Sequence, residues 1–173
     1  MEVDLRTLHL RALEPADIDF LYRLENDQSL WRISNTLLPF SKHTLENYIS
    51  NAHLDIFSVK QQRFVLSDHQ NTPLGLVDLY DFDPIHHRAG VGIVIDAKYR
   101  GQGMAKSGLK LIEKIAFVNL QMHQLYVGVG EGNEISLQLF LASGYRQVGV
   151  KEDWIYYNNQ YHNEVVLQKI AHV

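Results

Sequence analysis

A short turn with the sequence RGQGMA, residues 100–105, carries the strongest chemical signal in the chain. The apolar, β-branched segment 91–95 before it predicts a buried strand, and the amphipathic segment of about 103–119 after it predicts a helix. Gly101 and Gly103 can take backbone angles that a Cβ forbids, so a ligand can approach the main chain closely. The first amides of a helix have no partners within it, and the helix dipole adds partial positive charge there. The turn is therefore expected to bind an anion such as phosphate.

Two well-known phosphate-binding patterns do not fit this turn. A dinucleotide-binding G-x-G-x-x-G needs a third glycine where Lys106 stands. A P-loop needs glycines at the positions of Arg100 and Ala105, although Lys106 and Ser107 match its end. The turn by itself also leaves open a strand-to-helix connection that binds no ligand.

Composition restricts the classes of protein to which the chain can belong. Its 173 residues are expected to form a single domain, residues 1–173, and 46% hydrophobic with 21% charged residues is ordinary for a globular protein. A net charge of −4 argues against nucleic-acid binding and mildly favours cationic partners such as amines. The absence of cysteine excludes disulfides and thiolate chemistry. No apolar run approaches the ~20 residues of a membrane helix, so a cytoplasmic protein without a membrane partner is expected.

The hydrophobic patterns predict an α/β fold with a mixed sheet. Pro15 in a helix start, Ser41 and Asn133 as N-caps, and Gly144 as a C-cap mark the helix ends. Strands are expected at 8–13, 63–67, 74–80, 88–95, 125–129, 154–157 and 165–168. Helices are expected at 15–26, 42–53, 103–119 and 134–142, and an apolar loop at 30–40. In the last helix, Leu137, Phe140 and Leu141 are expected to share one face. This order gives antiparallel and parallel parts in one sheet.

Two spaced motifs resemble the GNAT family of N-acetyltransferases. Arg100-x-x-Gly103-x-Ala105 is similar to the family's R/Q-x-x-G-x-G/A motif, and residues 133–145 are similar to its N-x-x-S/A…G-F/Y signature. The opening segment 10–17 and the closing segment 159–164 resemble the branch that contains ribosomal-protein and spermidine N-acetyltransferases. The resemblance implies a mixed central sheet of about seven strands, helices on both faces, and a splayed pair of strands that binds the cofactor.

The resemblance also implies acetyl-CoA as cosubstrate and a set of residues that contact it. The pantetheine arm would pair with the backbone of the central strand, the pyrophosphate would lie on the turn amides, and the last helix would flank the thioester. These positions are Ile93, Val94 and Ile95; Arg100, Gly101, Gln102, Gly103, Met104, Ala105 and Lys106; and Asn133, Ser136 and Phe140. The side chains of 93–95 are expected to be core, and Asn133 to be a helix cap, a ligand contact or both.

The chain departs from the family at its catalytic positions. The implied reaction is direct attack of a neutral amine on the acetyl thioester, so a group must take the amine proton. The family's usual glutamate positions match Gly90 and Gly128, and its usual tyrosine position matches Phe140.

Replacement candidates lie on nearby strands. Asp78 is the candidate base, with Asp81 and His86-His87 as alternatives, and Tyr126 is the candidate proton donor because it shares a strand face with Gly128. Each also has a structural interpretation: a solvated strand carboxylate, a surface turn, or a packed aromatic side chain. We find no metal-ligand spacing.

The acceptor is expected to be a small primary amine or a protein N-terminal amine. In the resembling family the acceptor meets the loop near 31–40 and the final hairpin, which here contain aromatic residues such as Trp31, Trp154 and Tyr161. Segment 31–40 contains no carboxylate, which disfavours the polyamine alternative. A non-catalytic acetyl-CoA sensor is the second alternative, and the sequence leaves a homo-oligomer open.

Overall fold

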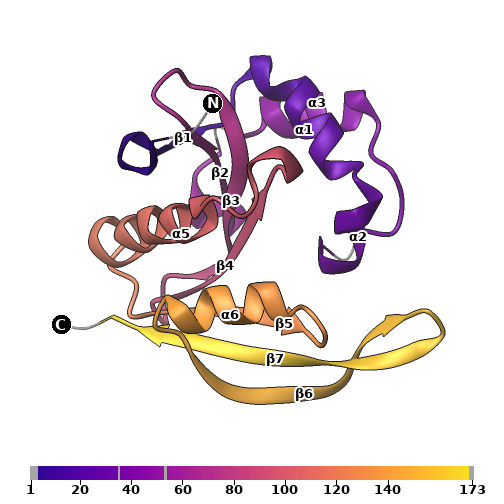
Figure 1. Ribbon diagram of the computed structural model, residues 1–173. Helices are drawn as coiled ribbons and strands as arrows, with labels where there is room; N and C mark the ends of the chain where they lie inside the picture. The colour runs from indigo at the N-terminus through magenta and orange to yellow at the C-terminus, as the bar shows by residue number, and fades with distance from the viewer. Residues whose placement is uncertain (1–3, 35, 53, 172–173) are drawn as a thin grey trace.

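One seven-stranded mixed sheet forms the centre of the computed structural model, which describes residues 4–34, 36–52 and 54–171 (Figure 1). The strand order is β1-β2-β3-β4-β5-β7-β6, and only β4 and β5 pair in parallel. The strands are β1 His9–Ala12, β2 Gln62–Ser67, β3 Pro73–Asp83, β4 Arg88–Ile95, β5 Gln124–Gly130, β6 Arg146–Tyr157 and β7 Gln160–Ile170. The predicted mixed sheet is confirmed, with a last hairpin longer than the sequence indicated.

Helices cover both faces of this sheet, as expected (Figure 1). They are α1 Ile18–Glu25, α2 Gln28–Ser34, α3 Lys42–Ser50, α4 Ile56–Val59, α5 Met104–Lys114 and α6 Glu134–Ala142, with short 3-10 turns at Leu5–Thr7, Pro15–Asp17 and Ala97–Tyr99 and a π-helical turn at Ile115–Asn119. The apolar sides of α1 and α3 pack on Val65 and Leu76, whereas α5 and α6 share a second core with Val77 and Val91. The sheet is therefore buried on both faces.

Two local predictions were wrong. Segment 30–40 was expected to be a loop, but Gln28–Ser34 is the helix α2, because Asp27 accepts hydrogen bonds from both the amide and the hydroxyl of Ser29 at its start. The loop begins only after this helix. Leu141 was expected on the buried face of α6, but it is 40% exposed, and Leu139 packs against the core beside Leu137 and Phe140 instead.

The central strands part from one another halfway along. Cα pairing between β4 and β5 runs from Arg88–Gln124 to Gly90–Tyr126 and, within the described residues, no further. Both strands continue, to Ile95 and Gly130, and β5 stays paired with β7 along its other edge. The predicted splayed pair is confirmed, and it leaves two unpaired backbone edges facing each other.

Candidate active site

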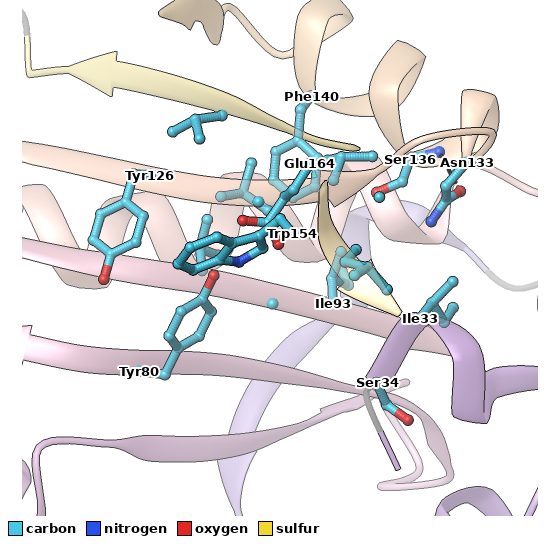
Figure 2. Close-up of a pocket in the computed structure, with 18 of the residues that line it drawn as sticks. Ile33, Ser34, Tyr80, Ile93, Tyr126, Asn133, Ser136, Phe140, Trp154 and Glu164 are labelled. Carbon is cyan, nitrogen blue, oxygen red and sulfur yellow. Dashed lines mark hydrogen bonds between the residues drawn. The ribbon is translucent and has the colours of Figure 1, made fainter. Parts of the chain in front are cut away.

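A cavity of about 490 Å³ lies where β4 and β5 part, with walls from eight elements, α2, β2, β3, β4, β5, α6, β6 and β7 (Figure 2). Nine of the residues singled out in the sequence line it: Asp78, Asp81, Ile93, Tyr126, Gly128, Asn133, Ser136, Phe140 and Trp154. The turn at 100–106 does not line it and lies past the end of β4. The structure thus brings the two candidate catalytic residues together with the α6 group, and separates both from the turn.

The backbone of β4 is available to a ligand where its side chains are not. Ile95 is 7% exposed in the core on the α5 side, and Val94 packs against the cluster on the α1 side. Ile93 contacts the α5 core and reaches the cavity wall. As expected, the side chains of 93–95 are mostly core, and the unpaired N–H and C=O groups face the gap toward β5.

The turn has the geometry of an anion site. Gly101 and Gly103 have φ of +75° and +81°, in the left-handed region that favours glycine, and Gly103 is the N-cap of α5. The amide of Ser107 makes a bond to the carbonyl of Gly103 (3.2 Å), so the earlier amides of α5 have no acceptor within the helix. The Arg100 Nε donates to the carbonyl of Ile95 (2.9 Å) and ties the turn to the end of β4.

These features fit an extended ligand with phosphate at one end. The amides of 104–106 lie in the first turn of α5, before its first internal hydrogen bond, while the Met104 side chain is 1% exposed in the core. The open strand edges lead from the turn toward the cavity. An acyl-coenzyme A has this combination of pyrophosphate, linear amide-bearing arm and terminal thioester.

The N-terminus of α6 closes the cavity on one side. Asn133 accepts a hydrogen bond from the Ser136 amide (3.2 Å), so it is a helix cap and a cavity residue at once. Phe140 is 1% exposed and packs edge-on against Tyr145, with ring centroids 5.0 Å apart.

This chain has glycines, Gly90 and Gly128, at the two positions where the family usually has a glutamate. At both positions a side chain from a neighbouring strand fills the space. A Cβ at Gly90 would overlap the ring of Tyr80 on β3. A Cβ at Gly128 would overlap the carboxyl group of Glu164 on β7, lying 2.6 Å from Oε2 and 2.7 Å from Oε1. Neither residue stands out in the sequence. A glycine opposite a large side chain is the signal, but it is visible only when the strand register is known.

Glu164 and Tyr80 are held in place from different sides. Glu164 has a side chain 13% exposed, and its Oε1 accepts from Lys151 Nζ at 2.8 Å. The Tyr80 ring meets the Tyr126 ring edge-on, and burial, with the charges of Glu164 and Asp81, raises the pKa of Tyr80 to about 12. Tyr80 therefore keeps its proton at neutral pH.

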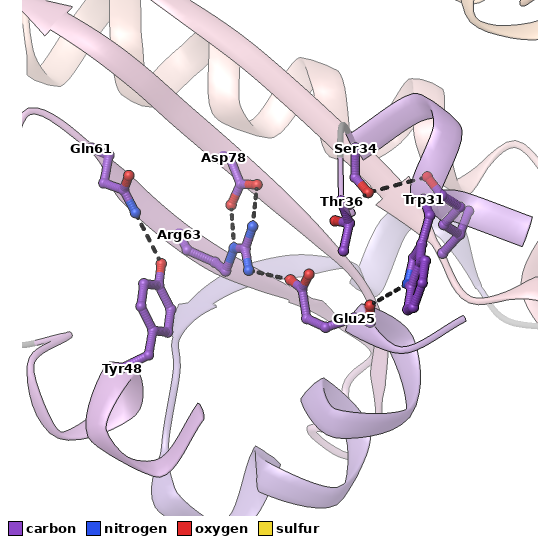
Figure 3. A network of polar contacts seen from close by, with 9 residues as sticks. Glu25, Trp31, Ser34, Thr36, Tyr48, Gln61, Arg63 and Asp78 are labelled. Atoms are coloured by element: carbon purple, nitrogen blue, oxygen red, sulfur yellow. Dashed lines mark hydrogen bonds and ion pairs between the residues drawn. The ribbon is translucent and has the colours of Figure 1, made fainter. Parts of the chain in front are cut away.

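Asp78 belongs to an ion-pair network beneath the cavity (Figure 3). Its two oxygens accept from Arg63 Nε (2.7 Å) and Nη2 (2.9 Å), and Arg63 also pairs with Glu25. Burial alone would lower the pKa of Arg63, but the charges of Asp78 and Glu25 raise it above its ordinary value. The ring of Tyr48 lies 5.6 Å from the guanidinium. Both Asp78 oxygens are thus committed to one cation.

Tyr126 donates to Asp81 Oδ2 at 3.1 Å and meets the Tyr80 ring edge-on, with centroids 6.0 Å apart. Burial and the charge of Asp81 raise the pKa of Tyr126. It pairs with Gly90, at the last rung before the strands part. The alternative bases His86 and His87 lie exposed in the β3–β4 turn.

The outer wall joins α2 to the final hairpin. Arg32 donates to the carbonyl of Glu131 (2.8 Å), and its guanidinium lies 5.0 Å from the Tyr157 ring centroid. Trp154 lines the same wall, with Lys151 Nζ 4.5 Å from its ring. Of the loop residues expected to meet the acceptor, Leu37 is 86% exposed and lies outside the cavity lining.

Two kinds of feature are absent from residues 4–34, 36–52 and 54–171. There, no three His, Asp or Glu side chains gather as a metal-binding group. Among the same residues, no helix combines the length and apolar character needed to cross a membrane.

Comparison with known proteins agrees with this geometry. A model described as "Acetyltransferase (GNAT) domain" matches residues 7–146. The spermidine N(1)-acetyltransferase of Escherichia coli K12 is 26% identical over 162 residues, which cover 92% of this chain and 83% of that protein.

Two solved structures from Vibrio cholerae share the fold over nearly the whole chain. Spermidine N-acetyltransferase in complex with CoA and spermine superposes with a TM-score of 0.87 at 26% identity, covering 95% of this chain and 96% of the other. A dodecameric spermidine N-acetyltransferase gives a TM-score of 0.80 at 28% identity, covering 95% and 94%. The resemblance noted in the motifs at 100–105 and 133–145 is confirmed. This chain belongs to the GNAT family of acetyltransferases, and acetyl-CoA is its acetyl donor.

Proposed function

We propose that this enzyme transfers the acetyl group of acetyl-CoA to a primary amine of a small polyamine. The relatives named above are spermidine acetyltransferases, and one was solved with spermine bound. The sequence analysis favoured a small amine or a protein N-terminal amine and kept the polyamine as an alternative. The charges of the cavity are the reason for preferring the polyamine.

Two carboxylates of the cavity carry the proposal. Asp78 is neutralised by Arg63 and Glu164 by Lys151, whereas Asp81 and Glu131 have no ion-pair partner among the described residues. A polyamine has ammonium groups besides the one that reacts, and unpaired carboxylates attract them. Strand β3 and the β5–α6 loop would thus supply the recognition that the carboxylate-free segment 31–40 does not.

The outer wall supports a small acceptor rather than a protein chain. Arg32 joins α2 to the carbonyl of Glu131 and stacks on Tyr157 of β6, so α2 is linked to two other parts of the rim. A protein N-terminus would need these links to open. A flexible alkyl polyamine would not.

The cosubstrate residues are proposed in two groups. Amides of the turn, from Gly101 to Lys106 with Arg100 beside them, would hold the pyrophosphate, and the backbone of 93–95 with Asn133 would hold the pantetheine arm. Ser136 and Phe140 would flank the thioester. The continuous sheet supports the expectation that residues 1–173 act as one catalytic domain.

A panel of acceptors tests the proposed substrate. Thiol release from acetyl-CoA is measured with spermidine, putrescine, butylamine and a short peptide with a free N-terminus. We expect kcat/KM for spermidine to exceed that for butylamine by at least ~10-fold, because each well-placed ion pair adds about 1 kcal/mol or more. The double change Asp81→Asn with Glu131→Gln should reduce this ratio toward one.

Three outcomes count against the proposal. Equal rates for spermidine and butylamine would remove the polyamine assignment, and preference for the peptide would restore the protein N-terminal amine. If acetyl-CoA binds but no amine releases thiol, the non-catalytic sensor is the better description.

Self-association through the outer strand is a second part of the proposal. Strand β6 is an edge of the sheet, and Val148, Val150 and Tyr156 on it are 56%, 48% and 62% exposed. Long apolar edge strands are usually covered, and the Vibrio cholerae relative is dodecameric. Light scattering should give a mass of two or more chains, and Val148→Glu with Val150→Glu should lower it. A monomeric parent would refute this part.

A further inference from the structure

We propose that Glu164, reaching into the cavity from β7, is the general base that takes the proton of the acceptor amine. This inference rests on the proposed acetylation of a small amine, and it names the group that replaces the family's missing glutamates. The Glu164 carboxyl group occupies the space that a side chain at Gly128 would fill. A carboxylate is therefore present at that position, although the strand that carries it is different.

The position of Glu164 is the first argument. Gly128 lies on β5 two residues past Tyr126, the last residue of that strand to pair with β4, so the carboxylate lies at the mouth of the gap that would hold the thioester. Figure 2 shows Glu164, Tyr80 and Trp154 converging on the middle of the cavity. The side chain is 13% exposed, which limits competition from water.

The hydrogen bonds of Glu164 are the second argument. Lys151 bonds only Oε1, and among the residues that the structure describes no group bonds Oε2. The lysine fixes the orientation of the carboxylate while one oxygen stays available to an amine. Asp78, in contrast, accepts from Arg63 with both oxygens. Asp81 and Glu131 are exposed at the rim.

The step balances without any other reagent. The amine nitrogen attacks the carbonyl carbon, and the C=O electron pair moves to oxygen as the C–N bond forms. Glu164 Oε2 takes one proton from the positively charged nitrogen. The oxyanion then collapses, the C–S bond breaks, and its electron pair leaves with the thiolate. Solvent returns a proton to the thiolate and removes one from Glu164, so an amide and a thiol are the products.

Other titratable groups surround this carboxylate and set the conditions of the test. Those that face it or share its wall are Lys151 on β6, Tyr80 and Asp81 on β3, Tyr126 on β5, and His162 two residues away on the same face of β7. Changing Glu164 alone leaves all of them in place. An effect on the proton transfer can then be separated from an effect on folding by measuring acetyl-CoA binding in parallel.

The experiment compares Glu164→Gln and Glu164→Ala with the parent, using whichever amine the parent acetylates best. Because a positioned base is worth about 10²–10⁴-fold, kcat/KM should fall at least ~10²-fold in both, with unchanged acetyl-CoA affinity. Added formate should restore part of the rate of Glu164→Ala in a saturable way, because it can enter the vacated space. Glu152 is an exposed carboxylate on the same hairpin, so Glu152→Ala should keep the parental rate, and added formate should not change that rate.

A purely structural role would give different results. Glu164→Gln has nearly the same shape and keeps a partner for Lys151, so it would then run within ~3-fold of the parent. That rate, or a folded Glu164→Ala that formate leaves unchanged, would overturn the proposal. If the parent prefers another amine to spermidine, the proposed substrate fails while the test of Glu164 remains valid.

Discussion

The two halves of this active site are built in different ways. Most of the proposed cosubstrate half is one continuous segment, residues 91–106, in which a strand edge leads directly into a glycine turn and a helix. Only Asn133, Ser136 and Phe140 at the α6 end are added to it from elsewhere in the chain. The acceptor half is assembled from β3, β5, β7, α2 and the hairpin, so its groups are distant in sequence. In the first half, we expect a single substitution to remove cosubstrate binding. In the second half, a lost side chain can be replaced from an adjacent strand.

The glycine positions illustrate this difference. Gly103 has no substitute, because its φ of +81° and the free amides that follow are properties of the backbone. At Gly90 and Gly128 the missing side chains are replaced by Tyr80 and Glu164. A function of the backbone therefore depends on one particular residue. A function of a side chain can be supplied by any residue whose side chain reaches the same place.

The largest effect should come from Gly103→Val. A branched Cβ at a left-handed position costs roughly 1–2 kcal/mol and obstructs the approach of phosphate to the amides. We expect acetyl-CoA to bind too weakly to raise the Tm. The parent should gain about 2.7 kcal/mol of stability at a ligand concentration of 100 Kd. Thermal melting with and without acetyl-CoA measures this difference.

Gly149→Val is the matched control for that variant. It adds the same side chain on β6, where a Cβ would meet no atom within 4 Å, so it should keep the full ligand-dependent shift. If Gly103→Val stays folded and binds acetyl-CoA like the control, the turn is not the pyrophosphate site.

A smaller effect should distinguish the two tyrosines of the acceptor half. The sequence prediction of Tyr126 as proton donor is still untested, and its hydroxyl is bonded to Asp81. The Tyr80 ring occupies the space that a side chain at Gly90 would fill, and with a pKa of about 12 its hydroxyl keeps its proton from about pH 6 to about pH 9. We expect Tyr80→Phe to lower kcat by ~10-fold and Tyr126→Phe by less than ~3-fold.

The opposite ranking would support the original assignment of Tyr126. Both variants should retain acetyl-CoA affinity, since neither residue belongs to the cosubstrate half. Over the same pH range, kcat/KM of the parent should rise as the acceptor amine loses its proton. A flat profile would argue against attack by a free amine.

How much of the structure could be predicted from the sequence also differs between the two halves of the active site. The turn and the caps at Ser41 and Asn133 could be predicted because each depends on neighbours in sequence. The splayed strands, which are distant in sequence, were expected only from the resemblance to the GNAT family. Helix α2 was missed although its start is also local, because only one interaction, that of Asp27 with Ser29, marks where it begins.

The acceptor half could not be predicted in this way. Tyr80 and Glu164 gain their positions only through the pairing of β3 with β4 and of β5 with β7. Asp78 lines the cavity, and its role as a base stays a prediction. Its ion pair with Arg63 also depends on strand register, because the two residues are cross-strand partners.

The most direct measurement moves the carboxylate from one strand to the other. Glu164→Gly empties the space beside Gly128, and adding Gly128→Glu in that background returns a carboxylate from β5, as in the family pattern. Gly128→Glu alone should be destabilised, since its three nearest neighbours are all atoms of Glu164. We predict that the double variant recovers at least ~10-fold in kcat/KM over Glu164→Gly. A double variant that folds and binds acetyl-CoA but stays as slow as Glu164→Gly would contradict the account.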